Sequence, residues 1–209
     1  MRIFKTPALL RYLFPDYTWR KPNTEKNIYL TFDDGPIPVV TEFVLKQLAD
    51  FQAKAIFFCV GENISRFPEI AQLIVRQGHY LGNHTHNHLR GWATPTETYV
   101  QNIALCQEQI DQIQENTSVK LFRPPYGRIK QKQFLKIKST YRVIMWDILT
   151  YDFDITLAPE KILQQALKKT TSGSVVVFHD SVKAFPNLQY VLPRYLHYFA
   201  EQGYSFKVL

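Results

Sequence analysis

The sequence has no long apolar run and contains little cysteine. Among its 209 residues, no stretch reaches the roughly 18 consecutive apolar residues that a membrane-spanning helix requires. The two cysteines, Cys59 and Cys106, do not form the spacing of a metal site or a disulfide framework. Because Cys59 lies inside the apolar run 55–60, we expect it to be a buried, reduced thiol. We therefore expect no transmembrane helix, and the two cysteines suggest no disulfide pattern.

The N-terminus lacks the pattern of a secretory signal peptide. Arg11 interrupts the apolar run that precedes it, and no small-x-small cleavage site follows. We expect residues 1–26 to form a lead-in that packs onto the domain through its apolar side chains, which are Leu9, Leu10, Leu13, Phe14 and Trp19. The pattern favours a cytoplasmic protein, with the cell envelope or export by another route as the alternative.

Basic residues outnumber acidic ones, 25 to 18, which gives a net charge of +7. Such a charge suits nucleic acid or an anionic polymer. However, the densest basic stretch, residues 128–138, lacks the repeated aromatic interleaving of the kind that stacks bases. We therefore interpret it as a solvated basic face and do not expect nucleic-acid binding.

Apolar runs alternate with amphipathic stretches from residue 27 to the C-terminus. Strands are predicted at 28–32, 55–60, 79–83, 119–122, 141–146, 174–178 and 205–208. Helices are predicted at 40–48, 68–77, 159–170 and 188–202, together with a long helix capped by Thr94, with Pro95 in its first turn. Nearly continuous apolar strands separated by helices indicate a parallel sheet covered by helices. We predict one α/β domain, residues 27–209, forming a distorted or incomplete (β/α) barrel of about seven or eight mostly parallel strands.

Polar clusters lie just past the ends of five predicted strands. They are Asp33 with Asp34, residues 84–88, residues 123–126, residues 147–152, and His179 with Asp180. In β/α barrels the loops that follow the carboxyl ends of the strands build the active site. The clusters therefore predict one functional rim.

The first two clusters contain the residue types of a metal centre. His84 and His88 lie four residues apart, which would place both rings on one side of a helical turn, while His86 would face elsewhere. With Asp34 as a third ligand, such a site keeps a position open for water and leaves Asp33 free beside it, as in a catalytic centre. The alternatives are a strand-end turn in which Asp34 caps a helix, and a histidine pair that is only polar surface.

Four short motifs resemble those of a known family. They are TFDDG at 31–35, HTHNH at 84–88, RPPYG at 123–127 and VFH at 177–179. From about residue 27 to the C-terminus, the chain resembles the polysaccharide deacetylase family, the NodB-homology enzymes of carbohydrate esterase family 4. The resemblance implies a metal-dependent hydrolase that removes N-acetyl groups from an amino-sugar glycan of the peptidoglycan, chitin or exopolysaccharide type.

The resemblance also implies a role for each matching residue. Asp33 would be the catalytic base, and Asp34, His84 and His88 would hold one divalent metal, zinc before cobalt, nickel or manganese. Arg123 would orient the base, the Tyr126 amide would bind the oxyanion, and His179 would be the general acid. Asp152, six residues after Trp146, would support both the arginine and the histidine.

The resemblance further places Trp146, Pro125, Phe153 and Val177 along the substrate groove. Phe153 stands where the family usually has tryptophan, and Val177 stands where it has a leucine that lines the acetyl pocket. Both differences are expected to change the shape of the groove and leave the catalytic groups in place.

Two further hypotheses use the same residues differently. A cytoplasmic amidase acting on a small acylated metabolite would keep the chemistry and change the substrate. A non-catalytic carbohydrate-binding module on the same fold would have lost a base, an acid or a ligand. Trp92 and Tyr151 are expected either to form sugar platforms or to be buried in loop packing.

Overall fold

In the described part of the chain, eight strands form a single sheet in which each pair of neighbouring strands is parallel. The computed structural model describes residues 2–22, 24–115 and 119–209, so residues 1 and 23 of the predicted lead-in lie outside it. The strands are β1 (Asn27–Asp33), β2 (Ala55–Cys59), β3 (Tyr80–Asn83), β4 (Lys120–Phe122), β5 (Tyr141–Val143), β6 (Ile148–Leu149), β7 (Val175–His179) and β8 (Ser205–Phe206). Their order is β5-β4-β3-β2-β1-β7-β6, with β8 beside β1.

The sheet curls because its two end strands are joined directly. The connection 144–147 between β5 and β6 contains no helix. Its first amide, on Ile144, donates to Phe122 of β4 at 2.8 Å, and its last, on Asp147, donates to Val175 of β7 at 2.9 Å. The chain therefore leaves one side of the sheet and joins the other. This confirms the predicted distorted barrel, although the single strand predicted at 141–146 is wrong and is divided between β5 and this connection.

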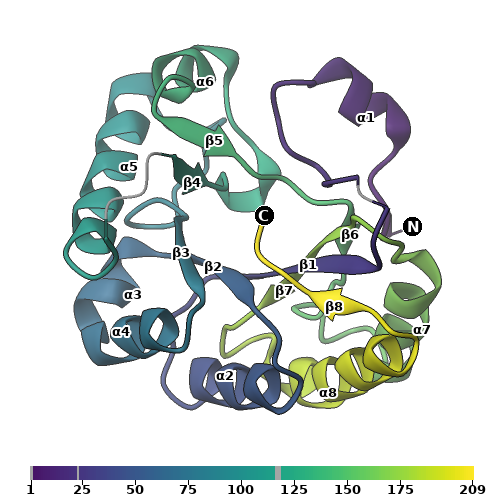
Figure 1. The fold of residues 1–209 in the computed structure, drawn as a ribbon. Helices are drawn as coiled ribbons and strands as arrows, with labels where there is room; N and C mark the ends of the chain where they lie inside the picture. The colour runs from purple at the N-terminus through teal and green to yellow at the C-terminus, as the bar shows by residue number, and fades with distance from the viewer. Residues whose placement is uncertain (1, 23, 116–118) are drawn as a thin grey trace.

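Helices surround the strands (Figure 1). They are α1 (Ala8–Leu13), α2 (Val40–Asp50), α3 (Gly61–Arg66), α4 (Pro68–Arg76), α5 (Thr96–Asp111), α6 (Gln131–Ile137), α7 (Pro159–Lys169) and α8 (Phe185–Glu201), with a short 3₁₀ turn, η1 (Pro125–Gly127). Thr94 does not cap α5 as predicted, because its hydroxyl donates to the Arg90 carbonyl at 2.8 Å. Within the described part of the chain, no helix is long and apolar enough to cross a membrane.

The core lies inside the barrel and under the helices. Every residue of β1 is buried, and Phe32 stacks between Phe57 of β2 and Phe178 of β7 at ring distances of 5.0 and 5.9 Å. Both cysteines are buried and free, as expected for Cys59. This packing keeps the strand ends, and the polar clusters on them, at fixed positions.

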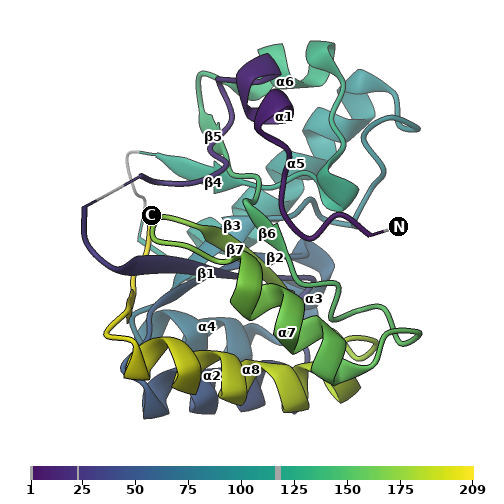
Figure 2. The same cartoon turned by 90° about the vertical axis from the view of Figure 1, so that its right-hand side faces the viewer.

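The N-terminal segment contacts the barrel differently from the sequence prediction. Leu9 and Leu13 of α1 are 64% and 56% exposed, whereas Phe4 and Trp19 on either side of the helix are each only 8% exposed. Backbone bonds fasten the segment along the β5–β6 connection: the Thr6 amide donates to Asp147, and the Met145 amide donates to Thr18. Figure 2 shows this segment beside β5 and β6. The contact predicted for Trp19 is confirmed. Those predicted for the leucines and Phe14 are wrong, since these side chains are 39–64% exposed and the segment is held by its backbone and two aromatic side chains.

Asp147 anchors this segment and is not part of the functional rim. Its carboxylate is fully buried, accepts a 2.7 Å hydrogen bond from Ser174, and faces Arg11 at 3.3 Å and Lys5 at 3.8 Å. The sequence pattern predicts Asp147 as part of the polar cluster 147–152 on the functional rim, and the structure corrects this prediction. Its cationic partners instead come from the N-terminal segment.

We predict that Asp147→Ala lowers the free energy of unfolding by about 2–4 kcal/mol, because it leaves a buried hydroxyl and two cations without their acceptor. Arg11→Gln is the control. Arg11 is itself 26% exposed, and Asp147 keeps Ser174 and Lys5 as partners in this variant, so the loss should stay below about 1 kcal/mol. Urea unfolding followed by circular dichroism measures both. Equal losses in the two variants would contradict the anchoring role of Asp147.

Candidate active site

The predicted site residues meet at one cavity of about 630 Å³. Its lining includes Asp33, Asp34, His84, His88, Tyr126, Trp146, Phe153, Val177 and His179. Three strands supply the polar groups, because the carboxyl ends of β1, β3 and β7 lie at the same edge of the sheet. Pro125 was predicted to line the groove, but it is buried in η1, and the neighbouring Pro124 lines the cavity in its place.

Asp33 is the last residue of β1 and is only 4% exposed. One carboxylate oxygen, Oδ1, accepts a hydrogen bond from Arg123 at 2.6 Å. In the sheet, Asp33 lies level with His179 on β7. A buried carboxylate therefore faces the cavity beside an imidazole.

The guanidinium of Arg123 is completely buried. It donates to Thr31 at 2.8 Å, and to the carbonyls of Ile144 and Met145 at 3.0 and 2.9 Å. Its Cζ atom lies 4.2 Å from the ring centre of Phe58. Burial lowers the pKa of Arg123, and the negative charge of Asp33 opposes that effect. Asp33 therefore has a cation partner in a fixed position.

Asp34, His84 and His88 form a donor set that fits a divalent metal. One ligand atom from each lies within 4.8 Å of the others, and Asp34 Oδ1 is 3.7 Å from His84 Nε2 and 3.3 Å from His88 Nε2. His84 Nδ1 is bonded to the Arg123 carbonyl at 2.8 Å, which leaves Nε2 for the metal. Three protein ligands leave a coordination position open, as in catalytic sites.

The protonation states of these groups also suit metal binding. Burial lowers the pKa of His84 to about 4, so its imidazole is neutral at physiological pH. Burial alone would raise the pKa of Asp34, but the hydrogen bond with His88 and the charges of the neighbouring imidazoles bring it below its usual range. Metal ligands must be deprotonated before they bind. His84 and Asp34 are therefore already deprotonated at neutral pH, before a metal binds.

The histidine tract is not the helical turn that its spacing predicted. Thr85 and His88 have positive φ angles of 63° and 52°, and the two imidazole rings converge at 5.0 Å across a bend. Buried Asn83 accepts from the Thr85 amide at 2.9 Å, and Asn102 of α5 accepts from the amide of His86 at 2.8 Å. These asparagines were not identified from the sequence. Asn102 could have been recognised as a polar residue on the buried face of α5, which also carries Tyr99 and Cys106.

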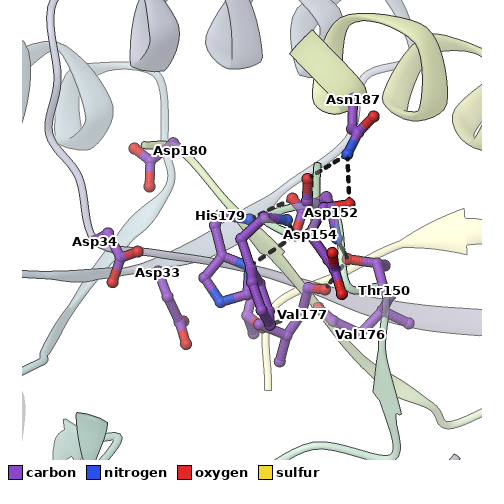
Figure 3. A network of polar contacts seen from close by, with 12 residues as sticks. Asp33, Asp34, Thr150, Asp152, Asp154, Val176, Val177, His179, Asp180 and Asn187 are labelled. Atoms are coloured by element: carbon purple, nitrogen blue, oxygen red, sulfur yellow. Dashed lines mark hydrogen bonds and ion pairs between the residues drawn. The ribbon is translucent and has the colours of Figure 1, made fainter. Parts of the chain in front are cut away.

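His179 is paired with Asp152, and Figure 3 shows this contact. Its Nδ1 lies 2.7 Å from one Asp152 oxygen, its amide donates to the other at 2.7 Å, and Asn187 donates to the Asp152 carbonyl at 2.8 Å. Burial alone would lower the pKa of His179, but the charge and hydrogen bond of Asp152 raise it to about 9. The imidazole is therefore protonated at neutral pH.

Asp180 is not the partner of His179. Its carboxylate accepts from the Gly35 amide at 3.1 Å and from Thr41 at 2.6 Å, and burial raises its pKa to about 8. It therefore shapes the loop that follows Asp34. Asp152 supports only His179 and not Arg123 as predicted, since the guanidinium bonds go to other residues.

Aromatic rings form the walls of the cavity. Phe153 packs edge-on against His179 at 4.8 Å, and Tyr126 packs against His88 at 4.8 Å. Trp146 lies so close to Gly127 that a β-carbon there would be 2.4 Å from the ring, and Gly127 also has a positive φ of 64°. Phe153 thus occupies the expected place in the groove and touches the candidate acid.

Comparisons with known proteins agree with this geometry. Residues 20–143 match the family model described as polysaccharide deacetylase. A peptidoglycan-N-acetylglucosamine deacetylase of Bacillus cereus is 32% identical over 90% of this chain and 89% of its own length. A chitooligosaccharide deacetylase of Azorhizobium caulinodans is 32% identical over 77% of each chain. The crystal structure of the Bc1960 peptidoglycan N-acetylglucosamine deacetylase superposes with a TM-score of 0.88, at 26% identity, over 98% of this chain and 95% of that one.

We predict that His88→Ala abolishes retention of a divalent metal, because two remaining ligands do not hold the ion against dialysis. His197→Ala is the matched control, since His197 lies on α8 and pairs with Glu201. Elemental analysis after dialysis against a weak chelator measures the bound metal. Full occupancy in the His88 variant would refute the ligand set.

Proposed function

The chain belongs to the polysaccharide deacetylase family, and from this premise we propose that it removes N-acetyl groups from N-acetylglucosamine-containing glycans. One observation carries the proposal. The Asp34-His84-His88 triad shares its cavity with a carboxylate held by arginine and a protonated histidine held by aspartate. Amide hydrolysis needs a base for water and an acid for the departing amine. The cavity offers both groups beside a metal site.

We propose that the metal is zinc, since a carboxylate and two imidazoles are ligands that zinc favours. When bound, the ion would polarise the acetyl carbonyl and make a water molecule easier to deprotonate. Asp34 would hold it through Oδ1, and the two histidines through Nε2.

Asp33 acts as the base in this proposal. Arg123 binds Oδ1, so Oδ2 is the oxygen that accepts the proton of the attacking water. Because Arg123 is anchored by two backbone carbonyls and a threonine, the carboxylate does not rotate during the reaction. A base held in this way lowers the barrier through orientation as well as basicity.

His179 acts as the general acid. Since Nδ1 is bonded to Asp152, Nε2 is the atom that donates its proton to the leaving amine. An amine leaves poorly without that proton. The backbone amide of Tyr126 would bind the oxyanion, a contact typically worth about 3 kcal/mol.

The groove residues determine the fit of the acetylated sugar. Trp146 and Val177 both line the cavity. Val177 is completely buried and presents a shorter side chain than leucine, so we propose that it widens the acetyl pocket. Phe153 keeps an aromatic face next to His179.

The proposal predicts that metal-loaded wild-type protein releases acetate from N-acetylated glycans. Asp33→Asn should lower kcat by about 100-fold or more, the range typical of losing a general base, while it retains the metal. Asp50→Asn, an exposed aspartate on α2, is the matched control and should keep full activity.

Chito-oligosaccharides, peptidoglycan fragments and acetylated monosaccharides should be compared in this assay. Near-normal turnover by metal-loaded Asp33→Asn would refute the base assignment. Acetate released only from monosaccharides would favour the small-metabolite amidase.

A second prediction concerns the pH profile. The acid works only when it is protonated, and its pKa of about 9 places the loss of activity near that pH. Asp152→Asn removes the charge that raises the pKa, so the basic limb should move toward the ordinary histidine value of about 6.5. Asp154→Asn, a matched change in the same loop, should leave the limb in place. An unchanged limb in Asp152→Asn would show that another group controls it.

A further inference from the structure

A second hollow adjoins the catalytic cavity on the side of Tyr126. It measures about 410 Å³ and is lined by Arg90, Trp92, Ala93, Tyr126 and Arg128. Tyr126 and Arg128 also line the catalytic cavity, so the two spaces share a wall. A glycan whose acetylated sugar occupies the catalytic cavity would extend a neighbouring sugar into this hollow.

Two arginine–aromatic pairs build the hollow. The Arg90 guanidinium lies 5.0 Å from the ring centre of Tyr126, and that of Arg128 lies 4.8 Å from Trp92. The Trp92 indole donates to the Ile129 carbonyl at 3.3 Å, which ties the loop after β3 to the loop after β4. Stacking restricts each guanidinium to one orientation and occupies its face, while its N–H groups along the edge remain available.

These two cations are solvent-facing and uncompensated. Trp92 and Tyr126 are 60% and 51% exposed, and both arginines are exposed. Across residues 2–22, 24–115 and 119–209, neither guanidinium forms an ion pair or a hydrogen bond. The carboxylates in the adjoining cavity are already engaged, Asp33 with Arg123 and Asp34 with the histidines. Lys183 adds a further positive charge to the lining of that cavity.

We propose that this hollow is a subsite for a carboxylate-bearing sugar, next to the sugar that is deacetylated. The inference rests on the proposed deacetylase function and names its substrate class. The arginines bind the carboxylate through their N–H groups, and Trp92 supplies an apolar face for the sugar ring. A neutral chitin-type chain would leave both charges without a partner. The protein therefore prefers a glycan in which a sugar with a free carboxylate neighbours the N-acetylated sugar, as in a peptide-free strand of N-acetylglucosamine and N-acetylmuramic acid.

The test compares acetate release from three soluble probes: N-acetylglucosamine–N-acetylmuramic acid strands, the same strands with the carboxyl groups methyl-esterified, and chitotetraose. The Arg90→Gln/Arg128→Gln double variant should lose about fivefold to tenfold in kcat/KM on the acidic strand. The ratio of its kcat/KM on the acidic strand to that on the ester or on chitotetraose should fall by the same factor, because neither of these probes carries the charge. Arg142→Gln is the control, since Arg142 is exposed and lines a different hollow with Val208 and Leu209.

Equal loss on all three probes, or no loss on the acidic strand, would overturn the subsite. Acetate release from none of the probes by wild-type protein would refute the proposed function instead. Binding of the acidic strand and of its ester to the Asp33→Asn protein can be measured by calorimetry without turnover. This measurement therefore distinguishes failure of the subsite from failure of the proposed function. Tighter binding of the acid than of the ester, lost when both arginines are also replaced, supports the subsite. Equal binding of acid and ester overturns it.

Discussion

Arg123 and its contacts connect most parts of the site. A fully buried guanidinium is costly to desolvate, and the cost is offset only when its N–H groups and its charge find partners. Here those partners are Thr31 and Asp33 of β1 and two carbonyls of the β5–β6 connection. The same residue accepts from His84 through its own carbonyl. One side chain thus couples the curvature of the sheet, the orientation of the base and the position of a metal ligand.

This coupling explains why strained backbone persists around the cavity. Asp34, His88 and Tyr126 have φ angles of 85°, 52° and 60°, a region that costs a non-glycine residue free energy. Hydrogen bonds from surrounding side chains compensate, for example from Asn63 to the Asp34 carbonyl at 2.7 Å. The conformations are specified by the fold before any ligand binds. A preorganised site loses less free energy to rearrangement when the substrate arrives.

The sequence predicted the barrel and the position of the metal ligands because both depend on local signals. Apolar runs mark buried strands, and the chemistry of Asp34, His84 and His88 follows from residue type and spacing. The bend at Thr85 could not be read from spacing, because it depends on Asn83 and on Asn102, which is distant in the chain. The predicted packing of residues 1–26 through their leucines was wrong for a similar reason. Asp147 and the backbone of the β5–β6 connection bind this segment, and hydropathy alone cannot show that Leu9 and Leu13 stay in solvent.

Net charge is the property that the sequence left least interpretable, and the structure explains why. A charge of +7 spread over a surface says little about partners, whereas two guanidinium groups stacked on aromatic rings beside a catalytic cavity constrain the ligand. The buried residues that perform the chemistry are held by many contacts and are intolerant of change. Arg90 and Arg128 have few contacts, so they can vary with little cost to stability. We therefore infer that recognition of a charged neighbouring sugar is separable from the chemistry, since the exposed pair Arg90 and Arg128 forms no hydrogen bond or ion pair with the buried catalytic groups in the described residues.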